Sequence, residues 1–424
     1  MANSNSDIAT ILVIGLSGAG LKTFKLLLDK LYPSCGSSDA GRALQIIAIE
    51  KSEFAYWPPG SLRASVEPGF EKNIFASFEN VIPKRIKNDP DKSKHVKVIT
   101  GVEVLKLDLV KKLATVNRNL ESYGLVGTDL SFDFLVIATG STYPFPCRPP
   151  SNANSIEETQ AEFRSLQTAI ESSKSLLIVG GGVVALEFAG EVSYRYSSAS
   201  TRKKITIVSS APALLTDHSK NLGSSIESQL LGRGVEIIYG YKVDLAAADI
   251  KETSKLDSLT KFNLKANKDG STQIVEADFV FLAIGNKPNS LLVSEQYRNP
   301  LNKGIKVNKH LQVLSNDSSK PLHGIYAVGD VSDFEESKLY AALDGQAATV
   351  SKNILLDITI PNGPSEKVVH KPIQGTISIP LGAYGGASEI LGFTTGLGPL
   401  ATSLAKGRGL FIWMFRSMYP DKPK

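Results

Sequence analysis

The sequence is poor in cysteine, since Cys35 and Cys147 are the only two in 424 residues. They are not spaced as C-x-x-C, so the chain lacks both a disulfide scaffold and a dithiol redox pair. We interpret each cysteine as a small buried apolar side chain. We also expect the protein to reside in a reducing compartment.

The sequence also lacks targeting and membrane signals. Its first residues contain no basic, apolar leader and no Arg-rich amphipathic start, and Ala2 excludes N-myristoylation. No apolar run is long enough to span a bilayer. The net charge of +5 is too small to indicate a nucleic-acid partner. We therefore expect a cytoplasmic protein, and its length allows two or three domains.

What the sequence does contain is a pair of glycine-rich turns. The first, ILVIGLSGAG, covers residues 11–20, and the second, LLIVGGGVVA, covers residues 176–185. Each is a buried apolar strand, a tight turn and the start of a helix, which points backbone N–H groups at a pyrophosphate. Two such turns predict two nucleotides in two similar domains, as electron transfer between a flavin and a nicotinamide requires.

The first turn departs from G-x-G-x-x-G at its middle position. Gly15 permits the tight turn and Gly20 permits close packing of helix on strand, but Ser17 replaces the middle glycine. The serine is small and its hydroxyl can itself donate to a phosphate. Glu50 ends the second strand, where a carboxylate can accept the ribose hydroxyls of an adenosine, and we expect the loop 33–41 to absorb the longer spacing. The alternative is a glycine-rich turn without a ligand.

The second turn, Gly180-x-Gly182-x-x-Ala185, fits the same fingerprint. The strand after it ends in Ser209-Ser210, with neither an acid for a ribose hydroxyl nor a base for a 2′-phosphate. The sequence therefore does not distinguish NADH from NADPH as the nucleotide bound at this turn.

Two further acids have both a functional and a structural interpretation. Asp330 follows a buried strand, so it can bind a flavin ribityl hydroxyl or simply cap a helix. Glu187 lies near the start of the second domain's helix, where it is either functional or a solvated helix-start acid.

The apolar periodicity predicts an α/β fold with two Rossmann-like dinucleotide-binding domains and a small C-terminal α+β region. The expected strands cover residues 8–14, 44–49, 132–138, 204–208, 273–284 and 324–330, with an antiparallel excursion over 95–118. The expected helices cover residues 18–31, 156–171, 183–196 and 336–357.

The order of motifs resembles the two-dinucleotide-domain flavoprotein reductases of the glutathione-reductase type. ATG at 138–140, GGG-x-x-A-x-E at 180–187, AIG at 283–285 and YAVGD at 326–330 carry this resemblance. The segments 61–70, 138–146 and 307–313 and the Gly-rich C-terminal region are similar to the apoptosis-inducing-factor-homologous, ferroptosis-suppressor type. The likeness runs from about Ile11 to Met418.

The resemblance implies non-covalently bound FAD, NADH or NADPH as donor and a quinone or other small molecule as acceptor. It implies an FAD-binding domain at 1–150 and 285–365, a NAD(P)H-binding domain at 151–284 and a C-terminal region at 366–424. It implies no metal.

The resemblance also assigns roles to residues. Gly15, Ser17, Gly18, Ala19 and Gly20 would hold the FAD pyrophosphate; Glu50, Lys51, Arg63, Val104, Ala138, Thr139, Gly140, Gly285, Gly329 and Asp330 would complete the FAD site; and Gly180, Gly182 and Ala185 would face NAD(P)H. Three residues would serve the chemistry. Glu187 would lie near the nicotinamide–flavin contact, Lys338 beside the flavin, and Gln346 would face the acceptor.

The C-terminal tail carries an apolar stripe at helical spacing. Its members are Leu404, Leu410, Phe411, Met414, Phe415 and Met418, with Trp413 and Tyr419 nearby and Lys406, Arg408, Arg416, Lys422 and Lys424 as basic residues. This pattern suits a helix on an anionic lipid surface, such as a lipid droplet or the outer mitochondrial membrane. A helix packed on the protein's own core gives the same stripe.

The favoured hypothesis is hydride transfer from NAD(P)H to flavin and then electron transfer to the acceptor. Without a cysteine pair the acceptor must approach the flavin itself. The alternative is a redox-sensing cell-death effector of the apoptosis-inducing-factor type with slow turnover. The sequence is compatible with either a monomer or a homodimer. Short basic clusters such as 202–204 do not support nucleic-acid binding, and nothing marks a monooxygenase.

Overall fold

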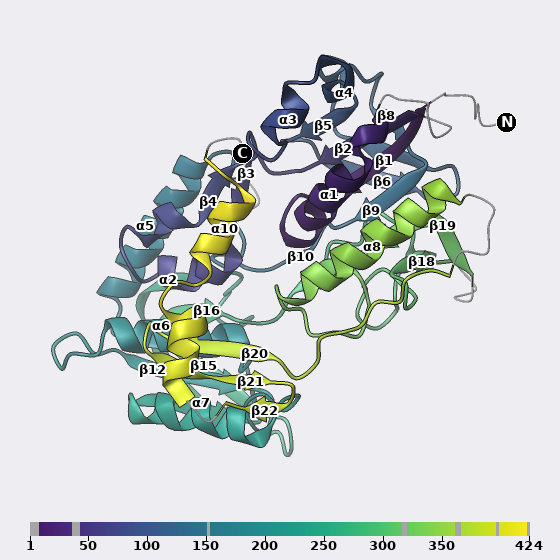
Figure 1. The fold of residues 1–424 in the computed structure, drawn as a ribbon. Helices are drawn as coiled ribbons and strands as arrows, with labels where there is room; N and C mark the ends of the chain where they lie inside the picture. Colours follow the sequence, from purple (N-terminus) through teal and green to yellow (C-terminus); the bar gives the residue numbers. More distant parts are fainter. Residues whose placement is uncertain are drawn as a thin grey trace.

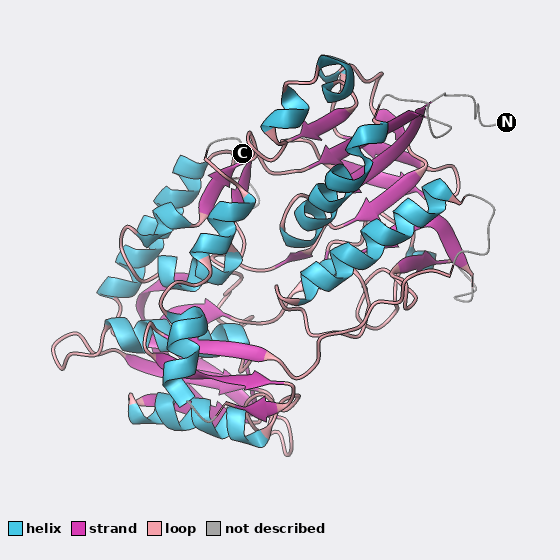
Figure 2. Ribbon diagram, viewed as in Figure 1, coloured by secondary structure: helices cyan, strands magenta, loops and turns pink. Residues whose placement is uncertain are grey.

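Two six-stranded sheets organise the chain, each covered by helices and set in its own lobe (Figures 1 and 2). The computed structural model describes residues 8–35, 43–150, 153–315, 320–360, 366–395 and 398–421. Among these residues, no helix combines the length and the apolar character needed to cross a membrane.

The sheet of the first lobe has the order β18-β19-β9-β1-β2-β5. These strands are β18 (Gln312–Leu314), β19 (Pro321–Ala327), β9 (Phe134–Ile137), β1 (Ile8–Ile14), β2 (Ala43–Ile49) and β5 (Val96–Ile99). Strand β1 is parallel to β2 and β9, and Ile14 pairs with both Ile49 and Ile137. The carboxyl ends of these strands therefore meet at one sheet edge, where ligands bind in open α/β folds.

The sheet of the second lobe repeats this plan with the order β13-β12-β11-β16-β15-β14. These strands are β13 (Val235–Tyr239), β12 (Lys204–Ser209), β11 (Ser175–Val179), β16 (Thr272–Leu282), β15 (Ser254–Ala266) and β14 (Tyr241–Val243). Val179 at the end of β11 pairs with Val208 and Leu282 on its parallel neighbours. The second glycine turn thus leaves a sheet edge of the same kind.

Long helices cover the sheets and bury apolar stripes. In the first lobe α1 (Gly18–Leu31) packs beside α8 (Ala342–Thr359) (Figure 1). Leu21, Phe24 and Leu28 of α1 are buried, as a stripe spaced by three and four residues requires. The second lobe carries α5 (Ile156–Ser172), α6 (Val183–Arg195) and α7 (Lys220–Gly232).

Smaller elements complete the lobes. The short strands are β3 (Phe54–Tyr56), β4 (Phe75–Ser77), β6 (Val104–Asp108), β7 (Leu113–Val116), β8 (Asp129–Ser131), β10 (Ser141–Thr142) and β17 (Lys287–Pro288), and the short helices are α2 (Ser61–Ala64), α3 (Lys84–Lys87) and α4 (Pro90–Ser93). The chain passes from the first lobe to the second near β10 and returns near β17. These two strands pair antiparallel.

Two expectations for local structure were wrong. The excursion over 95–118 is antiparallel only in β6 and β7, because β5 joins the first sheet parallel to β2. The helix expected from residue 336 begins at Ala342. The Lys338 ammonium binds the carbonyls of Gly329, Ser332 and Phe334, and these bonds hold the preceding residues in a loop. Part of the loop expected at 33–41 lies outside the described residues.

The C-terminal region begins as a small sheet on the second lobe and ends on the first. It contains β20 (Ile377–Leu381), β21 (Gly385–Ile390), β22 (Phe393–Thr394), α9 (Gly398–Thr402), a π-helical turn (Ser403–Gly407) and α10 (Ile412–Met418). The predicted stripe is therefore not one helix. Leu410, Phe415 and Met418 pack on the protein's own core, whereas Leu404 is exposed. Lys422 and Lys424 lie outside the described residues.

Candidate functional site

The first glycine turn is built so tightly that side chains are excluded. Gly15 has φ +91, and a Cβ there would lie 2.4 Å from the Ala138 carbonyl oxygen. A Cβ on Gly20 would lie 1.8 Å from the Gly15 oxygen. The start of α1 thereby sits directly against the ends of β1 and β9.

The second turn repeats this construction. Gly180 has φ +116, and a Cβ there would lie 2.3 Å from the Ala283 carbonyl oxygen. Ala138 and Ala283 each begin a short Ala-x-Gly segment whose glycine, Gly140 or Gly285, also has positive φ. The two lobes therefore present equivalent cradles.

The helix starts at both turns lack a side-chain cap from their N-cap residue. The Ser17 hydroxyl does not cap α1, and α6 begins after Gly182, which has no side chain to cap it. By contrast, Ser155 caps α5 and Ser219 caps α7 through their hydroxyls. Uncapped N–H groups at the positive end of a helix fit a diphosphate, so both cradles fit a dinucleotide.

Two cavities meet at the first turn. The larger has a volume of about 670 Å³ and includes Glu50, Lys51, Val104 and Thr139 in its walls. Its size falls in the range of cofactor sites, about 300–1,000 Å³. The smaller cavity, about 230 Å³, includes Gly18, Ala19, Gly329, Asp330 and Lys338. Ser17, Ala138 and Gly140 line both cavities, which therefore form one elongated site along the sheet edge.

Glu50 lies where it can receive a ribose. Its Oε2 accepts the Leu16 N–H at 2.6 Å, and its Oε1 accepts the Ser52 N–H at 3.0 Å. Burial raises the pKa of Glu50, although these backbone N–H groups oppose the shift. Lys51 points to Glu103 at 2.9 Å and forms an exposed ion pair of little energetic weight.

Asp330 lies at the other end of the elongated site. Its Oδ2 accepts the Ser141 hydroxyl at 2.8 Å and lies 3.5 Å from Nη2 of Arg148. Burial lowers the pKa of neighbouring Lys338, and Asp330 is the main group that opposes this shift. Two cations, Arg148 and Lys338, thus lie near one acid, Asp330. This arrangement favours a ligand that carries or develops negative charge.

Gln346 is bound to other protein groups, and its role toward an acceptor stays a prediction. Its side chain is buried, its Oε1 accepts the Gly329 N–H at 2.7 Å, and its Nε2 donates to Glu336 at 2.8 Å. Glu336 also lies 2.9 Å from His370 Nε2. Burial would raise the pKa of Glu336, but hydrogen bonds from His370, Gln346 and the Ile373 N–H hold it below its usual range. Gln346 therefore positions the Gly329–Asp330 turn.

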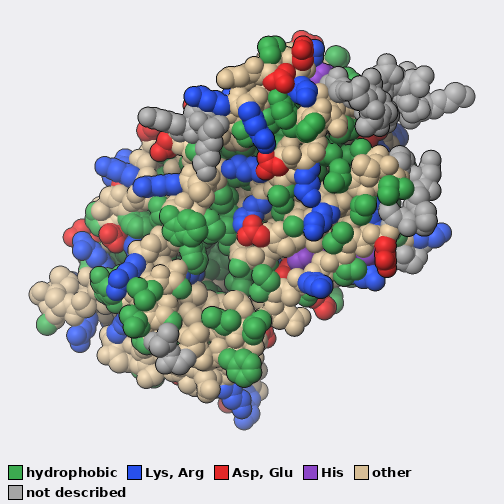
Figure 3. All heavy atoms as spheres, in the orientation of Figure 1, with side chains coloured by type: hydrophobic (Ala, Val, Ile, Leu, Met, Phe, Trp, Pro, Cys, Tyr) green, Lys and Arg blue, Asp and Glu red, His purple; other side chains and the backbone are tan. Residues whose placement is uncertain are grey.

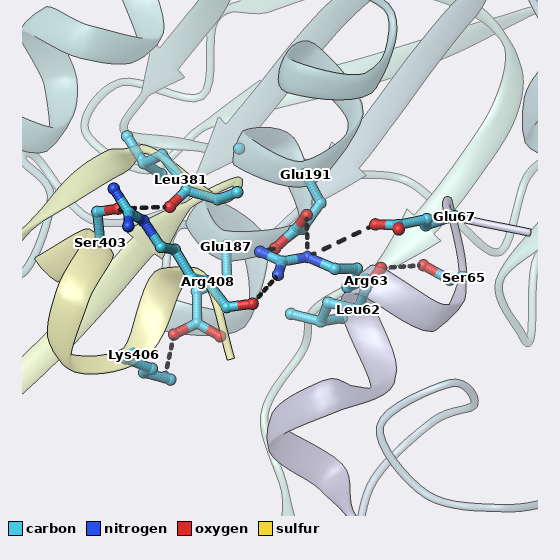
Figure 4. Close-up of polar contacts among 12 residues, drawn as sticks. Leu62, Arg63, Ser65, Glu67, Glu187, Glu191, Leu381, Ser403, Lys406 and Arg408 are labelled. Atoms are coloured by element: carbon cyan, nitrogen blue, oxygen red, sulfur yellow. Dashed lines mark hydrogen bonds and ion pairs between the residues drawn. The ribbon is translucent and has the colours of Figure 1, made fainter. Parts of the chain in front are cut away.

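Arg63 and Glu187 make ion pairs at the junction of the lobes (Figure 4). Arg63 is buried and binds Glu191 of α6 in a bidentate pair, at 2.8 and 3.1 Å, so it does not line either cavity. Glu187 accepts the Lys406 ammonium at 2.6 Å. Both predicted residues thus lie close together, but each is paired with another protein group.

Among the cavity residues that the sequence prediction missed are Arg148 and Tyr419, which line both cavities. Arg148 lies in the Pro-rich stretch 144–150, at the end of the segment 1–150 that the resemblance assigns to the FAD-binding domain. Tyr419 was named only as a neighbour of the tail stripe. A polar tip on an apolar ring at a buried stripe position is the signal that could have indicated it.

The chain matches known proteins over most of its length. The family model described as "Pyridine nucleotide-disulphide oxidoreductase" matches residues 9–350. "Apoptosis-inducing factor homolog A" of Dictyostelium discoideum is 28% identical over 418 residues, which cover 96% of this chain and 91% of that protein. "Ferroptosis suppressor protein 1" of Homo sapiens is 27% identical over 361 residues, with 83% of each covered.

Solved structures share the fold. The sulfide:quinone oxidoreductase from Aquifex aeolicus superposes with a TM-score of 0.69 at 19% identity, covering 97% of this chain and 92% of that one. The water-forming NADH oxidase from Lactobacillus brevis bound to NADH gives a TM-score of 0.61 at 18% identity, covering 90% of this chain and 74% of that one.

Proposed function

The chain belongs to the pyridine nucleotide-disulphide oxidoreductase family, and on that premise we propose that it passes electrons from NAD(P)H through FAD to a quinone. It is a flavin-dependent pyridine-nucleotide oxidoreductase that uses FAD and NAD(P)H. Bound FAD supplies a ring that accepts hydride from NAD(P)H and releases the electrons to the acceptor.

The observation that carries the proposed acceptor is the state of the two cysteines. Cys35 and Cys147 are free and buried, and burial raises the pKa of their thiols to about 11 and about 12. Such thiols are neither a relay pair nor nucleophiles, so electrons must leave the flavin directly to the acceptor. The likeness to ferroptosis-suppressor-type proteins favours a quinone.

We assign the FAD to the first lobe and NAD(P)H to the second. The N–H groups at the start of α1 would hold the FAD diphosphate, and Glu50 would accept the adenosine ribose hydroxyls. Asp330 would accept a ribityl hydroxyl. Lys338 would stabilise negative charge on the reduced ring. The start of α6 at Gly182 would hold the NAD(P)H diphosphate.

A stopped-flow experiment on the FAD-loaded protein tests this function. NADH and NADPH are each mixed with the enzyme, and a ubiquinone or menadione analogue follows in the second half-reaction. We expect flavin bleaching by at least one nicotinamide and rapid reoxidation by the quinone. Protein that carries FAD but leaves both nicotinamides unoxidised across the quinone panel contradicts the proposal.

The apoptosis-inducing factor homologue that matches 96% of the chain favours a second candidate, a redox-sensing effector of cell death. This role requires FAD and NAD(P)H to control shape or partner choice rather than turnover. The same experiment separates the two roles, because an effector would give slow reoxidation and a long-lived reduced charge-transfer complex. A nicotinamide-dependent dimer in sedimentation would support it further.

We also propose that the C-terminal region meets the lipid surface that holds the quinone, on a lipid droplet or the outer mitochondrial membrane. Leu391 and Phe393 at the β21–β22 turn are 73% and 79% exposed, and Leu400 and Leu404 beside them are 57% and 63% exposed. Helix α9 packs against β21, so these side chains lie on adjoining elements. Figure 3 shows hydrophobic side chains gathered on the face that carries the C-terminal region.

Flotation with anionic vesicles tests the lipid contact. We expect Phe393→Ser to reduce vesicle binding several-fold, whereas Leu301→Ser, at a leucine of the first lobe that is 91% exposed, leaves it unchanged. If Phe393→Ser floats like the unsubstituted protein, the lipid contact is refuted. If this variant instead alters dimerisation, the face binds a second copy.

A further inference from the structure

The C-terminal segment Arg408–Tyr419, here called the strap, crosses from the second lobe to the first (Figure 1). Just before it, Lys406 pairs with Glu187 on α6 at 2.6 Å. The Arg408 carbonyl then accepts Nη1 of Arg63 at 3.2 Å (Figure 4). The Leu410 carbonyl accepts Nε1 of Trp57 at 2.7 Å in the buried interior. Two backbone carbonyls of the strap are thus bound by side chains of residues 57–63, and the side chain of Lys406 just before the strap is bound to α6 of the second lobe.

Aromatic packing holds the far end of the strap on the first lobe. The Phe415 ring stacks on Trp57 with centroids 5.3 Å apart, and Tyr419 contacts Phe415 at 5.2 Å and Phe78 at 5.6 Å. Phe415 and Tyr419 are only 1% and 4% exposed. The strap is therefore part of the core of the first lobe and not a loose tail.

Tyr419 reaches the first glycine turn itself. Its hydroxyl donates to the Leu16 carbonyl at 2.7 Å, and both atoms are buried. The Leu16 N–H donates to Glu50 at 2.6 Å. The peptide units on either side of Leu16, between Gly15 and Ser17, are thus held by the strap on one side and by the ribose-binding acid on the other.

The strap also forms a wall of the elongated site. Tyr419 lines both cavities, and Met418 lines the smaller one together with Gly18 and Gly329. Lys25 of α1 donates to the Met418 carbonyl, so the strap also touches the helix whose start faces the diphosphate. Removing the strap would open this wall and release the Leu16 carbonyl.

We propose that the strap belongs to the FAD site, and that Tyr419 is a positioning residue that fixes the first glycine turn and closes the cavity over it. This inference rests on the assignment of FAD to the first lobe. Docking of the strap and binding of FAD are then coupled, and by linkage each strengthens the other by the same factor. No residue of the strap needs to take part in hydride transfer.

The test compares Tyr419→Phe, which removes only the hydroxyl, with Tyr239→Phe. Tyr239 donates to Glu227 at 2.6 Å in the second lobe, so this control loses a comparable hydrogen bond away from the first turn. FAD affinity is measured by titrating apoprotein with FAD and following flavin fluorescence. We expect Tyr419→Phe to weaken FAD binding about ten-fold, because it leaves a buried carbonyl without its donor. Tyr239→Phe should match the unsubstituted protein.

Limited trypsin cleavage at Arg416 supplies the reciprocal readout. We expect FAD to slow this cleavage in the unsubstituted protein, and to slow it less in Tyr419→Phe. Equal FAD affinity for all three proteins, or cleavage at Arg416 that ignores FAD, overturns the proposal. Neither measurement uses NAD(P)H or a quinone. A protein that binds FAD with strap coupling but reduces no quinone would refute only the proposed acceptor.

Discussion

Substituting Gly20 with alanine gives the sharpest test of the dinucleotide cradle. The added Cβ would lie 1.8 Å from the Gly15 carbonyl oxygen and 3.0 Å from the Ala138 Cβ. An ordinary contact between carbon and carbonyl oxygen is about 3.3 Å, so α1 must retreat from β1 by roughly 1.5 Å. The nearer crowding atom is a backbone oxygen and the other is an alanine Cβ, so no side-chain rotation relieves the clash.

The energetic consequence follows from that displacement. Overpacking of this kind costs about 1–3 kcal/mol, while alanine recovers at most about 1 kcal/mol of helix propensity. We expect net destabilisation of about 1–2 kcal/mol. The larger effect is on FAD, because the retreat of α1 removes charge-assisted hydrogen bonds to the diphosphate, each worth about 1.5–3 kcal/mol. FAD affinity should fall about 10–100-fold.

Flavin-fluorescence titration and thermal unfolding of the apoprotein measure the two effects separately. Gly232→Ala is the matched control, since Gly232 ends α7 in open space and does not have a positive φ. That variant should keep full FAD affinity. If Gly20→Ala binds FAD as tightly as Gly232→Ala, the close approach of α1 to β1 does not shape the site.

Three further substitutions test individual side chains. Glu50→Gln should weaken FAD binding about ten-fold in the same titration, because an amide accepts ribose hydroxyls less strongly than a carboxylate; unchanged affinity removes Glu50 from the ribose site. Lys406→Met should destabilise the protein by about 3 kcal/mol in urea unfolding, because it leaves the largely buried Glu187 carboxylate without its cation. Adding Glu187→Gln should restore much of the lost stability. A double variant no more stable than Lys406→Met refutes the pairing. Glu336→Gln should remove stability that Glu336 provides at neutral pH. The depressed folded pKa of Glu336 means that this contribution is complete above its unfolded value near 4.5 and is lost as pH falls through the folded value, so urea-unfolding curves of the two proteins should converge in acid. A gap that stays constant from pH 7 to pH 3 contradicts that pKa direction.

The glycine turns were predictable from the sequence because their cause is local. A strand, a turn with positive φ and a helix start follow one another within about ten residues, and only glycine satisfies the backbone at Gly15 and Gly180. Parallel pairing then brings Glu50 and Ala138 to the same edge, since consecutive strands of such folds end together. Local backbone geometry and strand order were therefore sufficient to predict the glycine turns and the positions of Glu50 and Ala138 beside them.

The contacts of Arg63 and Glu187 were not predictable, because their partners come from distant segments. Arg63 lies 128 positions from Glu191, and Glu187 lies 219 positions from Lys406. Motif position indicated that these residues lie near the junction of the two dinucleotides. Only the packing of α6 on the first lobe shows that Glu191 neutralises Arg63, and only the packing of the C-terminal region shows that Lys406 neutralises Glu187.

The sequence could not tell whether the apolar stripe of the tail faces a lipid surface or the protein's own core. An amphipathic stripe records that one face is hidden from water, and a bilayer and a protein core hide it equally well. The Trp57 ring stacks on Phe415 and also contacts Tyr340, so this part of the stripe is already covered by the first lobe. Exposed apolar surface remains instead at the Leu391–Phe393 turn, which has no helical periodicity and gives no signal to a periodicity search. If the protein reaches a membrane-dissolved quinone through its C-terminal region, that turn must touch the lipid, while the strap stays bound at the FAD site.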